Sequence, residues 1–311
     1  MFLGKSIKSI LKQLLMPLEV RLNTAEVRQR RMETNIEYMQ EALGRIEFRQ
    51  LDERPSNNLR DNEYRVFSQS GEDGIIQFLL KHIAIEQKIF VEFGVEDYSE
   101  ANTRFLLTNC SWSGLVLDGS DENILKIKQS RVYWKYNLKA TQAFVTRDNI
   151  NGILRDNGIV GEIGLLSIDI DGNDYWVWRA IDVINPVIVI IEYNHRFGKD
   201  LAVTIPYEES FVRGQNSQPV IYSGASLRAL YLLAESKGYS FVGCNSSGIN
   251  AFFVRKDKKP DQIRELSIEE GFVEGGFSET RDETGVIVKT SPEEERRIVM
   301  SLPLTNVGDN K

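Results

Sequence analysis

Residues 163–195 read IGLLSIDIDGND, YWVWRAIDVINP and VIVIIEYNH in succession, and this stretch decides the fold of the chain. Two apolar runs, Ile163–Ile168 and Val187–Ile191, have the length and β-branching of strands that are buried on both faces. Between them, Asn173–Val183 can form a helix. A strand, a crossover helix and a second strand make up the repeating unit of a parallel α/β sheet.

Acidic side chains stand where each of these strands ends: Asp169, Asp171 and Asp174 follow the first strand, and Glu192 follows the second. The carboxyl ends of strands in open α/β sheets form the ligand crevice, so we expect these acids to converge there. Carboxylates gathered in this way can bind a divalent cation or act as a general base. The alternative is that they are helix caps and loop acids, because Asp-Gly at 171–172 is also a favourable turn pair.

Length, composition and charge limit the classes of protein that fit. The 311 residues allow one large α/β domain with appendages, and 41% hydrophobic with 27% charged residues is typical of a soluble globular protein. A net charge of −7 argues against broad nucleic-acid binding. Two cysteines are too few for a disulfide framework and fit a reducing compartment, and no apolar run reaches the roughly 20 residues that span a bilayer.

Residues 1–16 are predicted to form a basic amphipathic helix, with three lysines, no acid and apolar residues at helical spacing. Such a helix can make peripheral contact with an anionic membrane surface, or it can pack on protein, and both interpretations stay open. The lysines interrupt the apolar core that a signal peptide would need. Pro17 is expected to end this helix.

Residues 17–50 are predicted to form a coiled coil. A narrow seam advances in steps of three and four, with one polar member, and consists of Leu22, Ala25, Gln29, Met32, Ile36, Met39, Leu43 and Ile46. This two-residue seam predicts a homo-oligomer through residues 22–46. The alternative is a single amphipathic helix that docks on the rest of the protein.

A polar linker is expected at 51–63, and a catalytic domain at 64–258, beginning with a helix that runs to about Ile83. Ile89–Phe93 is predicted as the first buried strand and is followed by Gly94, which lets a ligand approach the backbone closely. A second strand at Gly114–Leu117 ends in Asp118, the position where α/β nucleotide binders grip ribose hydroxyls.

The second half of the chain adds a long loop and a hairpin. Phe197–Tyr222 is polar and lacks periodicity, which is typical of a lid or a substrate loop. A helix at Ser223–Lys237 precedes two strands, Tyr239–Cys244 and Asn250–Arg255, that are separated by a turn and predict an antiparallel hairpin. Residues 259–311 are expected to form surface helices and a tail.

In this order, the strand ends resemble those of class I S-adenosylmethionine-dependent methyltransferases, in their FkbM-like branch. The matching segments are Ser68–Gly74, Phe90–Asn102, Leu165–Ala180, Ile190–Asn194 and Tyr222–Arg255. The resemblance implies an α/β fold with a Rossmann-like, mostly parallel sheet and a C-terminal antiparallel hairpin, preceded here by the helical coiled coil. The central segment also resembles metal-dependent sugar O-methyltransferases of the macrocin type. That likeness implies Mg²⁺ or another divalent cation, and a saccharide or glycan hydroxyl as methyl acceptor.

Carried over position by position, the resemblance implies an S-adenosylmethionine site made of Gln69, Gly71, Glu92, Gly94, Asn102, Thr103, Asp118, Gly119 and Ser120. It implies metal ligands at Asp169, Glu192 and Asn194, and a proton acceptor at Asp171 or His195. The chain departs from the family pattern after Gly94, where two further glycines are usual, and at Asn194, where the relatives have an acid.

Other functions stay open on the same residues. A haloacid-dehalogenase-like phosphotransferase has Asp-x-Asp-Gly after its first strand, and a glycosyltransferase can use Asp-x-Asp to bind a metal. A non-catalytic scaffold with a degenerate methyltransferase domain is a third possibility. The methyltransferase interpretation implies a cytoplasmic protein, at the inner face of the membrane if its acceptor is a lipid-linked glycan.

Overall fold

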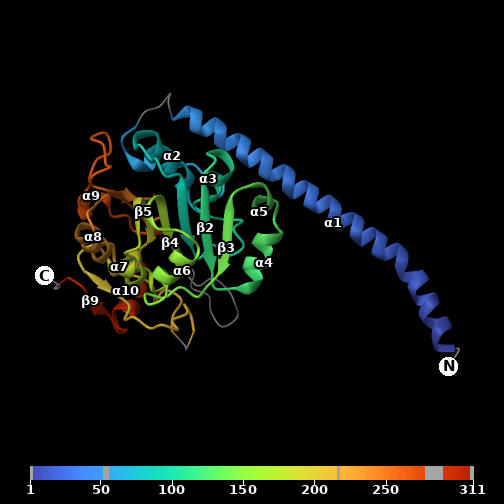
Figure 1. Ribbon diagram of the computed structural model, residues 1–311. Helices are drawn as coiled ribbons and strands as arrows, with labels where there is room; N and C mark the ends of the chain where they lie inside the picture. The colour runs from blue at the N-terminus through green and yellow to red at the C-terminus, as the bar shows by residue number, and fades with distance from the viewer. Residues whose placement is uncertain (1–2, 52–55, 216–217, 277–289, 309–311) are drawn as a thin grey trace.

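The computed structural model describes residues 3–51, 56–215, 218–276 and 290–308, without the side chains of 3–15 and 17–19. A seven-stranded sheet in the order β3-β2-β1-β4-β5-β8-β7 forms the centre of the molecule (Figure 1). Its strands are β1 (Ile89–Phe93), β2 (Ser113–Asp118), β3 (Leu138–Gln142), β4 (Gly161–Ile168), β5 (Ile184–Glu192), β7 (Tyr239–Cys244) and β8 (Asn250–Arg255).

Strands β1 to β5 are parallel, and β8 lies antiparallel between β5 and β7. The predicted Rossmann-like, mostly parallel sheet with a C-terminal antiparallel hairpin is therefore confirmed. The order of the strands reverses between β1 and β4, where Phe90 pairs with Gly114 on one side and with Leu165 on the other. Open α/β sheets bind ligands at the carboxyl end of such a switch point.

Helices cover both faces of the sheet. They are α2 (Glu72–His82), α3 (Arg104–Asn109), α4 (Asp121–Gln129), α5 (Arg131–Lys135), α6 (Ile150–Asp156), α7 (Asp174–Ala180), α8 (Leu227–Ser236), α9 (Ile268–Gly271) and α10 (Pro292–Met300). Helices α2, α3 and α4 pack on one face, where Phe90 of β1 points, and α6, α7 and α8 pack on the other, where Val91 points. Because strand side chains alternate between faces, strands buried on both sides need the continuous apolar runs seen in the sequence.

The β4–α7–β5 unit forms as predicted, although α7 ends at Ala180, three residues early. Asp174 begins this helix and is fully buried, and its carboxylate accepts hydrogen bonds from Ile170 N and Gly172 N, both at 2.8 Å. Burial nevertheless raises the pKa of Asp174 to about 6. Asp174 is therefore a capping residue of the turn before α7, which agrees with the alternative interpretation of these acids as helix caps.

The N-terminal helix α1 (Leu3–Gln50) is continuous, so the prediction that Pro17 ends a helix is wrong. A proline inside a helix removes one backbone hydrogen bond and keeps a helical φ, which can bend a helix without ending it. In Figure 1 the helix curves toward its N-terminal end. The side chains of the predicted basic face at 1–16 lie outside the described residues, apart from the exposed Met16.

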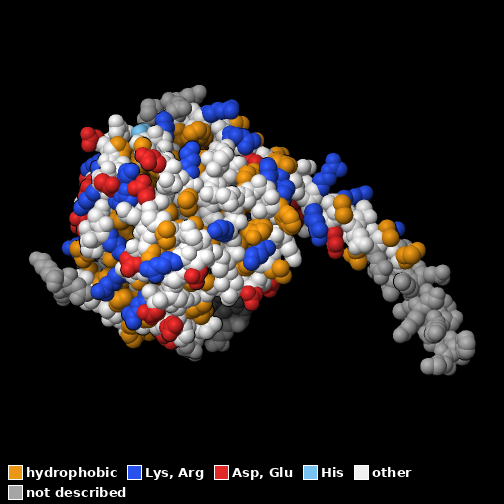
Figure 2. All heavy atoms as spheres, in the orientation of Figure 1, with side chains coloured by type: hydrophobic (Ala, Val, Ile, Leu, Met, Phe, Trp, Pro, Cys, Tyr) orange, Lys and Arg blue, Asp and Glu red, His pale blue; other side chains and the backbone are white. Residues whose placement is uncertain are grey.

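Among the described side chains of α1, those that pack on the domain lie in its C-terminal part and are polar or small. A Cβ atom on Gly44 would lie 2.5 Å from Val66 Cγ2, which shows how closely the helix backbone approaches the side chains of the domain. Glu37 forms an ion pair with Arg104 at 2.6 Å. The predicted seam faces elsewhere, and hydrophobic side chains are visible at the surface of the projecting helix in Figure 2.

The two flanks of the domain are more ordered than the composition suggests. In the predicted linker, the 3-10 helix η1 (Leu59–Asn62) packs on α2 and β7, with Leu59 and Asn62 buried, so the domain begins before residue 64. After α10, β9 (Thr305–Asn306) pairs with β6 (Val203–Thr204), which returns the chain to the domain. No helix within the described ranges has the length and apolar character needed to span a membrane.

Candidate functional site

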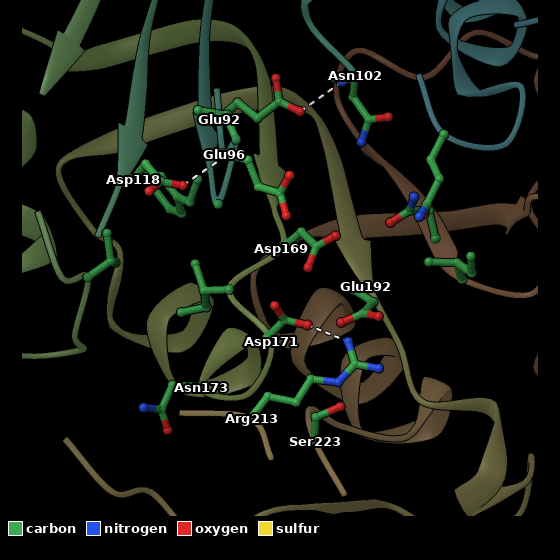
Figure 3. A pocket seen from close by; sticks show the side chains of 18 of the residues that line it. Glu92, Glu96, Asn102, Asp118, Asp169, Asp171, Asn173, Glu192, Arg213 and Ser223 are labelled. Atoms are coloured by element: carbon green, nitrogen blue, oxygen red, sulfur yellow. Dashed lines mark hydrogen bonds and ion pairs between the residues drawn. The ribbon is translucent and has the colours of Figure 1, made fainter. Parts of the chain in front are cut away.

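A cavity of about 420 Å³ opens at the carboxyl edge of the sheet, at the point where the strand order reverses. The ends of β1, β2, β4 and β5 line it, together with the loop around Phe211 and Arg213 and the hairpin turn at 247–250 (Figure 3). Its volume falls in the range of sites for small molecules and cofactors, roughly 300–1,000 Å³.

Gly94 allows the ends of β1 and β4 to meet beside this cavity. Its φ is +71°, and a Cβ atom there would lie 1.7 Å from the carbonyl oxygen of Asp169. No other residue type fits such an approach without moving the backbone. The glycine therefore brings the acids after β4 next to the part of the cavity that β1 and β2 line.

Glu92 shapes the wall of the cavity. It is 5% exposed and accepts hydrogen bonds from Asn102 N at 2.8 Å, Thr103 N at 3.1 Å and Thr103 Oγ1 at 2.5 Å. Burial raises its pKa to about 7, although these hydrogen bonds act in the opposite direction. Its oxygens thus hold the loop at 102–103, and Asn102 beyond it lines the cavity and donates from Nδ2 to Ser167 Oγ at 3.1 Å.

Asp118, at the end of β2, is held in one orientation. Oδ2 accepts from Glu96 N at 2.8 Å, while Oδ1 accepts from Ser120 N at 2.8 Å and from Asn123 Nδ2 at 3.1 Å. Each oxygen of an ionised carboxylate can accept about two hydrogen bonds. Oδ1 accepts two here and Oδ2 accepts one, so Oδ2 can accept one more. Asp118 lines the cavity between the ends of β1 and β2, with acceptor capacity left for a ligand.

The remaining residues expected at the donor site divide into two groups. Gln69 and Gly119 line the cavity. Gly71, Thr103 and Ser120 stand behind it: Gly71 precedes α2 with φ +98°, Thr103 supports Glu92, and Ser120 caps α4 by accepting from Asn123 N. The structure gives these three a supporting position.

Three carboxylates converge on the other side of the cavity. One oxygen each of Asp169, Asp171 and Glu192 lies within 4.8 Å of the others (Figure 3). The pKa of Asp169 is raised well above its usual range, first by burial and then by the negative charges of Glu192 and Asp171. Two neighbouring strand ends thus bring their acids together, as the sequence predicts, into a set of hard oxygens that suits a divalent cation.

Arg213 reaches this acidic cluster from the long loop after β5. Its Nη1 donates to Asp171 Oδ1, and its Nε donates to Val220 O at 2.8 Å. Arg213 was not predicted as a site residue, because only its place in the predicted substrate loop indicated a function. Its guanidinium lowers the pKa of Asp169, opposing the effect of the acids around it.

Asn194, expected as a metal ligand, forms its hydrogen bonds with backbone atoms of the surrounding loops. Its Nδ2 donates to Ile221 O at 2.9 Å and to Ser223 O at 3.0 Å, and its Oδ1 accepts from Arg196 N. The two Nδ2 bonds tie the loop to Asn194, while Oδ1 keeps a second acceptor position. The third carboxylate of the cluster belongs to Asp171, which was predicted as a proton acceptor.

His195 is half-buried at the edge of the cavity, against Gly275. Burial, and then the charge of Arg196, lower its pKa to about 4, so the imidazole is neutral at pH 7. Its Nε2 has no hydrogen-bond partner among the described residues, and the same holds for Asn173 Oδ1 and Ser247 Oγ. All three residues line the cavity, and buried polar atoms rarely stay unpaired in native proteins, so the cavity suits a ligand with several hydrogen-bonding groups.

No family model and no curated protein sequence matches this chain. Similar solved structures include an S-adenosylmethionine-dependent methyltransferase from Clostridium acetobutylicum, 11% identical, covering 59% of this chain and 90% of that one, at a TM-score of 0.37. An O-methyltransferase from Bacillus cereus in complex with SAH is 16% identical; the match covers 53% of this chain and 72% of that one, at a TM-score of 0.35. TrmK from M. capricolum, in complex with S-adenosyl-homocysteine, is 15% identical; the match covers 63% of this chain and 74% of that one, at a TM-score of 0.36. At these values, the assignment of the fold rests on the strand order itself.

Proposed function

We propose that this chain is an S-adenosylmethionine-dependent O-methyltransferase that acts, with a divalent cation, on a hydroxyl of a saccharide or glycan. One observation carries the proposal: the Asp169, Asp171 and Glu192 cluster borders a cavity at the switch point of a sheet with methyltransferase strand order. The donor and the cation would therefore lie side by side in one site.

The β1–β2 side of the cavity fits a nucleoside methyl donor. Asp118 can accept hydrogen bonds from ribose hydroxyls, because its orientation is fixed and Oδ2 keeps acceptor capacity. Gly94 and Gly119 leave the backbone accessible, and the half-exposed Phe144 offers an apolar surface for a base. When bound, the donor supplies an activated methyl group on its sulfonium.

The acidic cluster fits a divalent cation by its chemistry. Burial raises the pKa of Asp169 most, and repulsion among three carboxylates at this spacing adds to the effect; a cation with oxygen preference relieves that repulsion. Asp169 and Glu192 would hold it, and Asp171 stands beside them. A bound cation lowers the pKa of a coordinated hydroxyl and fixes its direction.

Asp171 is the better of the two predicted proton acceptors. Its side chain is 54% exposed and faces the cavity, so a substrate hydroxyl can reach it. The low pKa of His195 makes that imidazole a weak base. The orphaned Nε2 of His195 is suited instead to accept or donate a hydrogen bond that orients the acceptor.

The lining of the cavity supports a hydroxyl-rich acceptor. Asn173 Oδ1 and Ser247 Oγ await hydrogen-bond partners, and Arg213 and Ser223 stand beside the acidic cluster (Figure 3). A saccharide can satisfy several such groups at once. Holding it against the donor in attack geometry can contribute up to about 7–11 kcal/mol to the lowering of the barrier.

The enzyme alternatives fit the fold less well. In a haloacid-dehalogenase-like phosphotransferase, Asp-x-Asp-Gly follows the first strand, whereas here it follows the fourth strand in chain order. A glycosyltransferase site needs neither a glycine at the end of β1 nor the terminal β7–β8 hairpin, and this chain has both.

Titration calorimetry with S-adenosylhomocysteine tests the donor site. We expect wild-type protein to bind it, and Asp118→Asn to bind it roughly 10- to 100-fold more weakly, the usual loss for a hydrogen bond to a charged group. A uridine diphosphate sugar should give no heat. Binding of the sugar nucleotide without binding of S-adenosylhomocysteine would refute the proposal in favour of a glycosyltransferase.

A further inference from the structure

An apolar stripe on α1 stays exposed along the whole predicted seam. Its large members are 48–61% exposed: Leu22, Met32, Ile36, Met39, Leu43 and Ile46. Single exposed apolar residues are ordinary, but a contiguous row at heptad spacing marks an interaction surface. The row extends over 24 residue steps, or about 36 Å of helix.

The contact between α1 and its own domain leaves this row uncovered. Where the structure describes the side chains of this helix, the half-buried or buried ones are Thr34, Glu37, Glu41 and Gly44. In a heptad whose a and d positions form the seam, these residues occupy positions b and f, on the opposite side. The alternative that the seam itself docks on the domain is therefore wrong, because a different face of the helix docks.

The helix also needs a partner for its N-terminal part. Every described side chain from Val20 to Glu33 is exposed, so this stretch has no packing against the domain. Helices in proteins gain most of their stability from the packing of one face, and a projecting helix lacks that support as a monomer.

Charges beside the seam select the partner and its direction. Arg21 and Arg28 occupy g positions, and Glu26 and Glu33 occupy e positions. In a parallel pair of identical helices, g of one copy faces the following e of the other, so each arginine meets a glutamate. In an antiparallel pair with Leu22 opposite Ile46, g faces g and e faces e, which would place Arg21 against Arg49 and Glu33 against Glu33 and leave Arg28 opposite Ala42.

We propose that residues 22–46 form a parallel, in-register coiled coil with the same segment of a second copy of this chain. Gln29 of each copy then meets its counterpart, and a polar pair at one a position fixes the register. Each catalytic domain is carried on the outer face of its own helix, through Glu37 and Gly44. This assembly is independent of the proposed methyltransferase activity.

Cysteine cross-linking tests the direction and register. In the parallel coil Leu22 faces Leu22, so Leu22→Cys should give a covalent dimer under mild oxidation, while Asn23→Cys, at an outward b position, should not. In an antiparallel coil Leu22 would face Ile46. A dimer that forms only in the double variant Leu22→Cys/Ile46→Cys would therefore overturn the parallel arrangement.

Light scattering tests the surface itself. Ile36→Lys, in the seam, should reduce the assembly to monomers, and the matched control Val27→Lys, exposed at 67% but outside the seam, should leave the mass unchanged. Arg28→Glu should raise the dissociation constant several-fold, and Arg28→Glu/Glu33→Arg should restore it. Circular dichroism checks that each variant is folded. A monomeric wild type, or an unchanged mass in Ile36→Lys, would overturn the proposal.

Discussion

Glu92 retains a proton close to neutral pH because its carboxyl is buried in the cavity wall, where its pKa rises from 4.5 to about 7. The folded protein therefore binds a proton that the unfolded chain releases at lower pH. Stability from this proton is fully present below pH 4.5 and is lost as the pH rises through 7. Asp169, whose pKa is also raised, contributes with the same sign.

From these shifts we expect the protein to be more stable at pH 6.5 than at pH 8. Glu92 alone contributes about 0.8 kcal/mol over this range, or about 2–3 °C in Tm for a domain of this size. His195, with its pKa lowered to about 4, changes charge mainly below this window. Differential scanning calorimetry in EDTA measures the effect, and Asp169→Asn should keep the part that belongs to Glu92. A Tm that stays level or falls toward pH 6.5 would contradict the burial argument.

Arg213 brings a positive charge to the acidic cluster through Asp171. Removing it in Arg213→Gln leaves the carboxylates more negative, so we expect a divalent cation to bind roughly three- to tenfold more tightly, an effect limited by the exposure of Asp171. Calorimetric titration with Mn²⁺ measures the change. Weaker binding in Arg213→Gln would mean that the arginine orients Asp171 for the cation instead of competing with it.

At the scale of elements, Glu72 joins the first helix of the domain to its terminal hairpin. The side chain is fully buried and accepts hydrogen bonds from Ser70 N at 2.8 Å, Asn245 Nδ2 at 2.6 Å and Asn250 Nδ2 at 2.9 Å. Because the hairpin turn lines the cavity through Ser247 and Asn250, this clamp also holds one wall of the site.

Removing the clamp should be costly. Glu72→Ala leaves two buried amides without their acceptor, so we expect a loss of roughly 2–4 kcal/mol in the free energy of unfolding. Glu72→Gln should lose less, because one acceptor oxygen remains. Urea denaturation measures both, with the exposed Glu86→Gln as a control that leaves stability unchanged. An unaltered midpoint in Glu72→Ala would show that the hairpin is held by its strands alone.

The elements that the sequence predicts best are those with the clearest local pattern. The bounds of β1, β7 and β8 agree with the prediction because each strand is a short apolar run between turn residues. Pro17 was wrongly predicted to end a helix, because the helix-forming residues on both sides override its own preference against a helix interior. The bonds of Asn194 Nδ2 to carbonyl groups 27 and 29 residues away carry no local signal, so the sequence did not predict them.

At the scale of the whole molecule, the convergence of Asp169 and Glu192 followed from topology alone, because parallel strands end at one edge of the sheet. The other half of the site depends on tertiary contacts that no local pattern encodes. Arg213 reaches Asp171 across 42 residues, and Glu72 reaches Asn250 across 178. The docking face of α1 was hidden for the same reason, since Gly44 and Glu37 carry no apolar signal.

The cluster of three carboxylates should decide whether the protein is active. We expect Asp169→Asn and Glu192→Gln each to abolish metal-dependent methyl transfer, with the fold retained, because each variant removes a charged oxygen ligand from the set. Far-ultraviolet circular dichroism and binding of S-adenosylhomocysteine provide the controls. Full activity in either variant would remove the cation from the mechanism.

Binding of Mn²⁺, followed by the loss of its free-ion electron paramagnetic resonance signal, tests whether the acidic cluster holds a divalent cation. We expect one tightly bound ion per chain in wild-type protein and in Asp118→Asn, which alters the β1–β2 side of the same cavity, and none in Asp169→Asn or Glu192→Gln. Equal binding by all four proteins, or no binding by the wild type, would contradict it.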